Sequence, residues 1–162
     1  MNVRDDLPPV YPSIDNCLDD MPKVLVKHRF QASAADAWRK LGRFSAIADW
    51  QSLVESCVSE EREDGFYRVM LMKDCSMFTE RLEAFSHAAR YLSYSIISGP
   101  LPIKNYVSDF MIIPNGSHSG QCDLVWRAWY DVPATSDSAR IKSELEELFG
   151  NGIIGMCRLL EK

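Results

Sequence analysis

Two charged residues of this 162-residue chain, Arg68 and Glu80, alternate with apolar residues in strand-like segments. Glu80 lies in the strand-like segment 77–85, and Arg68 lies in the neighbouring segment 66–72. A carboxylate on an apolar face either pairs with a cation or has a raised pKa and becomes a proton donor. We therefore expect Glu80 either to form a buried ion pair with Arg68 or to serve as an acid-base or ligand-orienting group.

His28 is the third candidate for chemistry, because imidazole titrates near neutral pH and is a common general base. A lone histidine in a strand is more often a hydrogen-bonded wall residue, and both interpretations stay open. The sequence contains no Gly-rich phosphate loop, no nucleophile elbow and no cluster of His, Cys and carboxylate residues at metal-ligand spacing. It therefore implies no metal and no cofactor.

Composition narrows the class of partner. The 18 Lys and Arg residues against 23 Asp and Glu give a formal charge of −5, which argues against nucleic acid and anionic lipid as partners. No run of about 18 apolar residues is present, so we expect no membrane insertion. The five cysteines are widely separated without a CxxC pair, which favours reduced thiols and a cytoplasmic protein.

The chain divides into an arm and one domain. Residues 1–22 carry five aspartates and four prolines, which favours an extended arm, either mobile or strapped over the domain. A further hypothesis makes this arm a docking segment for a partner protein. Residues 23–162 form the domain.

Within the domain, period-two alternation predicts a first strand over 24–30, and Ser33 and Asp36 have the spacing of a capping box for a short helix that Gly42 ends. A second short helical segment is expected over 45–50. Further strands at hairpin spacing are predicted over 53–59, 66–72, 77–85, 90–98, 104–113 and 121–132.

The period changes from residue 136 onward, where apolar residues recur every three or four positions, as in a long amphipathic helix. Gly150, Gly152 and Gly155 fall inside it, and each costs roughly 1 kcal/mol of helix propensity relative to alanine. Either tertiary packing compensates and the small residues permit a close approach, or the helix kinks or ends at Gly150.

This order of elements resembles the SRPBCC superfamily, in particular its START-related polyketide cyclase/dehydrase and lipid-transport branch, from about residue 24 to 160. The resemblance rests on Ala32-x-x-x-Asp36-x-Trp38, Trp50, Gly65-x-x-Arg68, Glu80-Arg81-Leu82, Tyr94-x-Ile96, Gly99-Pro-Leu-Pro102 with Tyr106, Pro114 and Trp126-x-x-x-Tyr130. It implies an α+β helix-grip fold. In that fold a curved antiparallel sheet of six to seven strands wraps around a long C-terminal helix, and two short helices follow the first strand.

The resemblance also implies a deep cavity between the sheet and the final helix, and it supplies the inward phase of the strands. In this phase Arg68 and Glu80 face the same side, and Trp126 rather than Trp129 faces the cavity. The 99–102 hairpin is similar in place to the gate loop of plant hormone receptors in this superfamily, although it is equally consistent with a simple turn. The expected catalytic residues are Glu80, His28 and Arg68; the expected ligand-binding residues are Trp50, Met70, Leu82, Tyr94, Leu101, Tyr106, Phe110, Trp126, Tyr130, Phe149 and Ile153.

We therefore expect the protein to bind a hydrophobic or aromatic small molecule. A homodimer is one possible oligomeric state. The protein would act as a cofactor-independent cyclase or dehydratase in which Glu80 or His28 moves the proton. Arg68, Tyr94 or Tyr106 would stabilise the enolate oxygen. The alternative is a non-catalytic carrier or sensor of lipids or hydrophobic metabolites, since the same apolar wall serves both classes.

Overall fold

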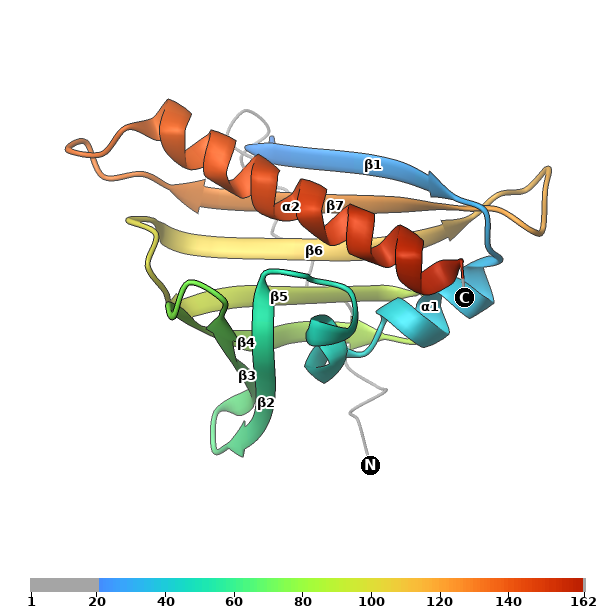
Figure 1. The fold of residues 1–162 in the computed structure, drawn as a ribbon, viewed down its shortest axis with the longest axis horizontal. Coiled ribbons are helices and arrows are strands. Elements are labelled where there is room, and N and C mark those ends of the chain that lie inside the picture. Colours follow the sequence, from blue (N-terminus) through green and yellow to red (C-terminus); the bar gives the residue numbers. More distant parts are fainter. Residues whose placement is uncertain (1–20, 162) are drawn as a thin grey trace.

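The computed structural model describes residues 21–161, so the predicted arm lies almost wholly outside the described residues. The elements lie close to the positions that the alternation of apolar residues predicts (Figure 1). They are β1 (Val24–Phe30), α1 (Ala34–Leu41), the 3-10 segment η1 (Phe44–Asp49), β2 (Val54–Arg62), β3 (Gly65–Met72), β4 (Met77–Ser86), β5 (Tyr91–Ser98), β6 (Lys104–Pro114), β7 (Cys122–Asp131) and α2 (Ser138–Leu160).

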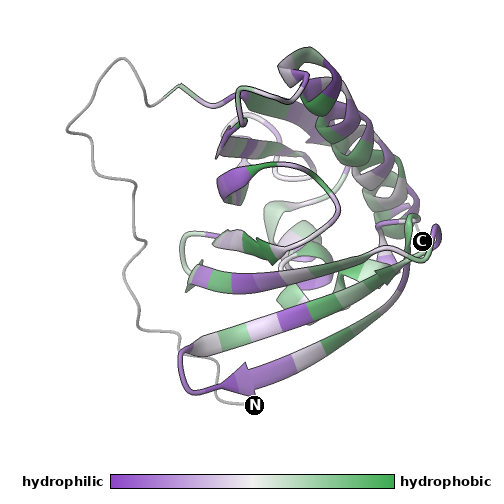
Figure 2. Cartoon of the chain, turned by 90° about the vertical axis from the view of Figure 1, so that its left-hand side faces the viewer, coloured by the Kyte–Doolittle hydropathy of each residue, from purple (hydrophilic) through white to green (hydrophobic). Residues whose placement is uncertain are grey.

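The seven strands form one antiparallel sheet in the order β1-β7-β6-β5-β4-β3-β2. The sheet curves, and α2 lies across its concave side (Figures 1 and 2). Along the strands hydrophobic and hydrophilic residues alternate, which gives the sheet one apolar face toward α2 (Figure 2). This confirms the helix-grip α+β fold.

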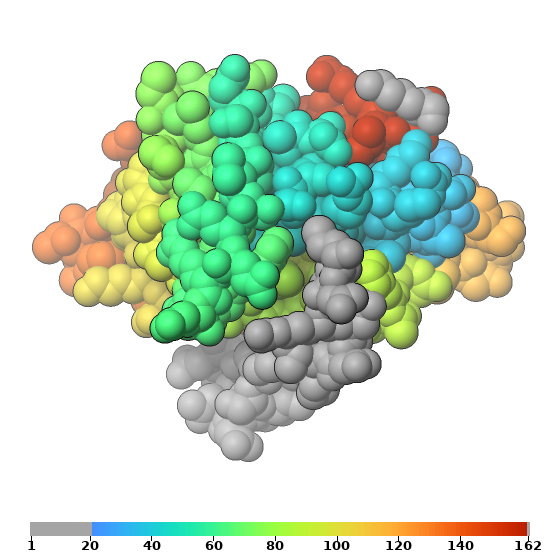
Figure 3. All heavy atoms as spheres, turned by 90° about the horizontal axis from the view of Figure 1, so that it is seen from below, coloured from blue at the N-terminus to red at the C-terminus, as the bar shows by residue number. Residues whose placement is uncertain are grey.

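The short helices close one end of the sheet. Ser33 caps α1 by accepting a hydrogen bond from the Asp36 backbone N–H at 3.1 Å, and Gly42 is the C-cap, as the spacing predicts. Atoms of α1 and η1 pack beside β2 and near the C-terminal end of α2 (Figure 3). No helix within residues 21–161 is long and apolar enough to cross a membrane.

The final helix is continuous through its three glycines. Gly155 contacts the backbone of Trp50 so closely that a Cβ built on it would lie 1.5 Å from the Trp50 carbonyl oxygen. At Gly152 a Cβ would lie 3.0 Å from the Trp126 ring, whereas at Gly150 it would meet no atom within 4 Å. The helix therefore persists, and two of the glycines permit the close approach that their spacing suggested.

A β-bulge alters the start of β6. The pairing with β7 shifts between Lys104 and Val107, and Asn105 takes the left-handed conformation with φ +54°. Strict alternation would place Lys104 on the same face as Tyr106, but Lys104 is exposed while Tyr106 is buried. The bulge thus aims a phenol into the molecule and keeps the neighbouring cation outside.

Candidate functional site

A buried ion pair lies on the concave face of the sheet. Arg68 on β3 and Glu80 on β4 are directly opposite in the strand register, and both are at most 6% exposed. The Arg68 Nε donates to Glu80 Oε2 at 2.6 Å, Nη2 lies 2.5 Å from the same oxygen, and Nη1 donates to the Phe44 carbonyl at 2.7 Å. The guanidinium also lies over the rings of Phe44 and Tyr94. The predicted pair is present.

The contacts with Arg68 involve only one of the two Glu80 carboxylate oxygens. Both guanidinium contacts go to Oε2, and Glu80 lines a small space beneath α2, which we call the interior space. Burial raises the pKa of the Glu80 carboxyl, and the Arg68 charge opposes that rise. A carboxyl in this setting can hold or accept a proton at Oε1 while Arg68 keeps Oε2 in place.

A second polar group lies beside this pair. The Trp126 indole Nε1 is 3.1 Å from both the Tyr94 hydroxyl and the Ser108 hydroxyl, and Ser108 in turn donates to the Arg127 carbonyl at 2.6 Å. These bonds link Trp126 on β7 to Tyr94 on β5 across the intervening strand β6, which carries Ser108. They confirm that Trp126 faces inward, whereas Trp129 lies on the other face under the Arg127 guanidinium.

The interior space is small because aromatic side chains fill it. Its volume is about 60 Å³, against about 300–1,000 Å³ for ordinary ligand pockets. Phe149 of α2 stacks on Trp126 with ring centroids 4.0 Å apart and planes 9° apart. The deep cavity implied by the resemblance is therefore not confirmed. The lining residues are Ile47, Gln51, Val54, Met70, Met72, Phe78, Glu80, Tyr94, Ile96, Tyr106, Trp126, Leu145, Leu148 and Phe149.

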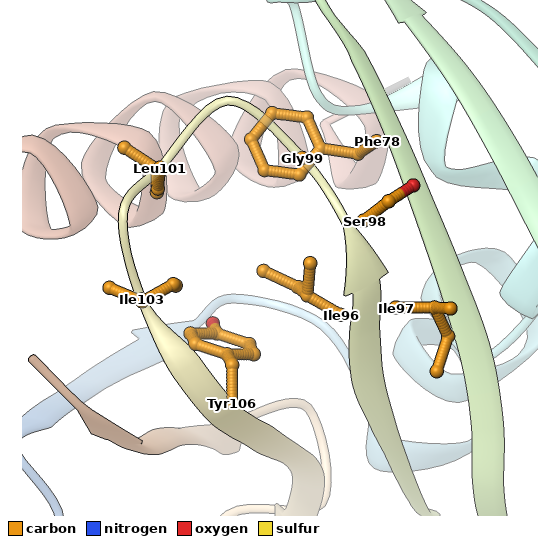
Figure 4. A pocket seen from close by; sticks show the side chains of 8 residues that line it. All are labelled: Phe78, Ile96, Ile97, Ser98, Gly99, Leu101, Ile103 and Tyr106. Atoms are coloured by element: carbon orange, nitrogen blue, oxygen red, sulfur yellow. The ribbon is translucent and has the colours of Figure 1, made fainter. Parts of the chain in front are cut away.

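A larger pocket opens next to it at the loop between β5 and β6. This mouth pocket has a volume of about 230 Å³ and is lined by Phe78, Ile96, Ile97, Ser98, Gly99, Leu101, Ile103 and Tyr106. In Figure 4, Leu101 and Ile103 on the loop face Ile96 and Tyr106 across the pocket. Phe78, Ile96 and Tyr106 line both spaces, so these three side chains form the partition between them.

Gly99 allows the loop to approach the partition. A Cβ on Gly99 would lie 2.8 Å from the Phe78 ring, closer than side chains tolerate. The loop therefore packs directly on one of the three partition residues, and a movement of residues 99–103 would free the Phe78 ring. This arrangement gives the 99–102 hairpin the position that a gate requires.

His28 lies apart from this site. Its side chain faces α2 from the edge strand β1, and its Nε2 is 3.3 Å from the Cys157 Sγ. It lines neither the interior space nor the mouth pocket. The structure therefore brings Glu80 and Arg68 together and leaves the third predicted catalytic residue with a thiol partner of its own.

The predicted ligand-binding residues separate into three groups. Met70, Tyr94, Trp126 and Phe149 line the interior space, Leu101 lines the mouth pocket, and Tyr106 lines both. Trp50, Phe110 and Tyr130 lie in the aromatic layer around these spaces. Trp50 stacks on Phe110, and Tyr130 stacks on Tyr106. Leu82 and Ile153 are half-buried against the core and line neither space.

Sequence reasoning missed several lining residues. Phe78 shares the face of Glu80 by strict alternation, so period two alone could have found it. Gln51 gave no such signal, because it follows η1 in a loop. Its side chain is 5% exposed, donates to the Leu148 carbonyl at 3.0 Å and so ties this loop to α2 beside the interior space. No group of three or more potential metal ligands occurs within residues 21–161.

The buried phenols predict loss of stability in alkali. Burial raises the pKa of Tyr94 to about 12 and places that of Tyr106 above its usual range. Above pH 10 the unfolded phenols ionise first, so the free energy of unfolding falls, by roughly 2–3 kcal/mol for Tyr94 between pH 10 and 12. Urea unfolding across this range should show the fall. Tyr94→Phe should have a shallower slope, with Ser108 still bound to Trp126; an unchanged slope would count against this assignment.

The chain is similar to known proteins in both sequence and fold. Residues 21–152 match the family model described as polyketide cyclase / dehydrase and lipid transport. The chain belongs to this family. The solved structure of the protein XoxI of Bacillus cereus is similar in fold, with 22% sequence identity and a TM-score of 0.77 over 86% of this chain and 95% of that one.

Two further solved structures are similar in fold. A Thermobifida fusca protein is 28% identical with a TM-score of 0.66, over 81% of this chain and 84% of that one. The di-domain ARO/CYC protein BexL, from the BE-7585A biosynthetic pathway, is 12% identical with a TM-score of 0.72, over 85% of this chain and 46% of that one. A search of proteins with curated functions finds no significant match.

Proposed function

We propose that this protein binds a hydrophobic or aromatic small molecule between the sheet and α2 and acts on it as a cofactor-independent cyclase or dehydratase. The observation that carries the proposal is Glu80, a buried carboxylate that lines the interior space on an aromatic wall and whose contacts with Arg68 both go to Oε2. Family membership and the fold shared with an ARO/CYC protein support the same class of ligand.

Binding requires the two spaces to join. The partition consists of three side chains, and the loop 99–103 packs on one of them. Displacement of Phe78 and of the Phe149 ring from Trp126 would open one continuous chamber from the mouth pocket to Glu80. The ligand's own apolar surface would replace the aromatic contacts that are lost, so the energy of opening is recovered on binding.

In the catalytic reading, the walls hold a flexible poly-carbonyl chain in a folded, reactive conformation. Glu80 Oε1 removes the proton that accompanies ring closure or water loss, while Arg68 holds the carboxylate in position. The Tyr94 and Tyr106 hydroxyls, which keep their protons because burial raises their pKa values, are available to donate to the enolate oxygen.

A carrier or sensor is the second candidate, and one observation favours it. His28 is bound to Cys157 away from the two spaces, so no second acid-base side chain of the kind predicted faces Glu80. A cyclase that relies on Glu80 alone must use the same carboxyl as both base and acid. A carrier needs only the apolar walls.

Native mass spectrometry and a fluorescent probe test the binding proposal. The purified full chain should carry a co-purified compound or, when stripped, bind the neutral probe N-phenyl-1-naphthylamine with increased emission. An enzyme should convert a poly-β-ketone test substrate, and Glu80→Gln should abolish turnover while probe affinity stays within a few fold. A co-purified compound released unaltered, with no conversion of the test substrate by the wild-type protein, would favour the carrier. If no compound co-purifies and the probe does not bind, the binding proposal is wrong.

A further inference from the structure

The charge that faces a ligand in this site is negative. Within residues 21–161, Glu80 is the only residue with a formal charge among those that line the mouth pocket and the interior space. Arg68 lies behind it: two of its nitrogens hold Glu80 Oε2, the third donates to the Phe44 carbonyl, and the Phe44 and Tyr94 rings cover its guanidinium. Arg68 therefore holds Glu80 Oε2 in place but does not itself line either space.

The bulge in β6 removes the other cation from the site. Lys104 directly follows the mouth-pocket residue Ile103, and regular alternation would put its side chain on the concave face. The shift in pairing at Asn105 leaves Lys104 exposed, and the Asn105 side-chain amide donates to Asp131 at 2.7 Å, which holds the bulge. Lys104 therefore supplies no compensating charge to an anionic ligand at the mouth.

Glu80 lies immediately behind the partition. It pairs directly opposite Ile96 in the register of β4 and β5, so their Cβ atoms are about 5 Å apart. Phe78 lies two residues earlier on the same face of β4, about 7 Å away. A ligand that occupies the mouth pocket and passes the partition therefore meets the carboxylate with its leading end, while its remaining surface contacts Leu101, Ile103 and Phe78.

We infer that the site selects neutral ligands that present a hydroxyl or amine N–H donor to Glu80 Oε1, with their apolar end in the mouth pocket, and that it rejects carboxylates. The preference depends on the proposed function, because it specifies the ligand of the same site. A donor gains a charge-assisted hydrogen bond. A ligand without a donor leaves Oε1 desolvated and unpaired, and a carboxylate adds a like charge in a poorly solvated space.

Three probes of one shape test the preference in the wild-type chain: 4-ethylphenol, ethylbenzene and 4-ethylbenzoate at pH 7. Titrations followed by amide chemical shifts should give an affinity for the phenol about tenfold or more higher than for either of the others. If N-phenyl-1-naphthylamine binds but the three probes bind equally well or do not bind at all, the inferred ligand preference is wrong and the proposed function still stands. If neither the naphthylamine nor any probe binds, the proposed function fails as well.

Two charge-matched variants locate the origin of the preference. Glu80→Gln removes the charge but keeps an amide oxygen, so the phenol should lose most of its advantage over 4-ethylbenzoate. Glu83→Gln is the control, because Glu83 lies on the same strand, pairs with Arg81 and accepts from Ser95, and lines neither space. It should keep the wild-type ranking. An unchanged ranking in folded Glu80→Gln contradicts the inference; should that variant not fold, the wild-type ranking still decides.

Discussion

Replacing Arg68 with methionine is expected to lower the free energy of unfolding by about 3–5 kcal/mol at pH 7, measured by urea denaturation. The substitution keeps an unbranched, flexible stem but leaves the Glu80 carboxylate buried without its cation, and it removes the donor that satisfies the Phe44 carbonyl. Removing one member of a buried pair costs far more than the pair contributes, because the remaining charge stays desolvated.

The double variant Arg68→Met with Glu80→Met should recover most of this loss, since two apolar side chains then replace two charges. The loss in the single variant should also shrink as the pH falls toward 4. A buried carboxyl without its cation has a raised pKa in the folded state, so its protonated form favours folding. That contribution is fully present below the unfolded pKa of about 4.3 and is lost as the pH rises from there through the raised folded pKa. As a control, Arg140→Met breaks only the exposed pair with Glu144 and should cost at most about 0.5 kcal/mol. Equal losses in both single variants would show that burial of the Arg68 pair carries no special cost.

Replacing Gly155 with alanine is expected to destabilise the protein by about 3 kcal/mol or more, or to prevent folding. The added Cβ would lie 1.5 Å from the Trp50 carbonyl oxygen and 2.6 Å from its carbonyl carbon. These are backbone atoms, so they cannot rotate away as a flexible side chain could. Either α2 must lift from the loop after η1, or the loop must shift and carry the Trp50 ring off Phe110 and Trp126.

Gly150 supplies the matched control in the same helix. A Cβ there meets no atom within 4 Å, so Gly150→Ala should gain about 0.5–1 kcal/mol from helix propensity alone. Thermal and urea unfolding of the two variants should therefore shift in opposite directions. A Gly155→Ala protein as stable as wild type would mean that the helix and the loop are not in direct contact.

The Arg68 and Gly155 substitutions test the two sides of the interior space, the sheet and α2. Arg68 and Glu80 fix the sheet side of the interior space, whereas Gly155 and Trp50 set how closely α2 approaches it. A ligand has to work against both, because the space of about 60 Å³ opens only if α2 or its side chains move away from the sheet. The rigidity that makes these substitutions costly is therefore also what a bound molecule must overcome.

Local signals were enough to predict the elements. Alternation of apolar residues predicts β1 at its observed bounds, and the Ser33–Asp36 spacing predicts the cap of α1. The burial of Arg68, Glu80, Tyr94 and Trp126 follows from the same alternation once the inward face is known. These features depend on residues close in sequence or directly opposite on neighbouring strands, so the order of residues carries them.

The sequence alone determined the strands, the final helix and a carboxylate, Glu80, that alternates with apolar residues, because side-chain periodicity is a property of short segments. The helix-grip arrangement and the inward face were implied by the resemblance to the SRPBCC superfamily. Only the tertiary structure decided how much room the aromatic inner wall leaves. The bulge at Asn105, the Gly155 contact with Trp50 and the stack of Phe149 on Trp126 each join segments far apart in the chain. Packing between distant segments sets the volume and the ligand-facing charge, and no local pattern records it.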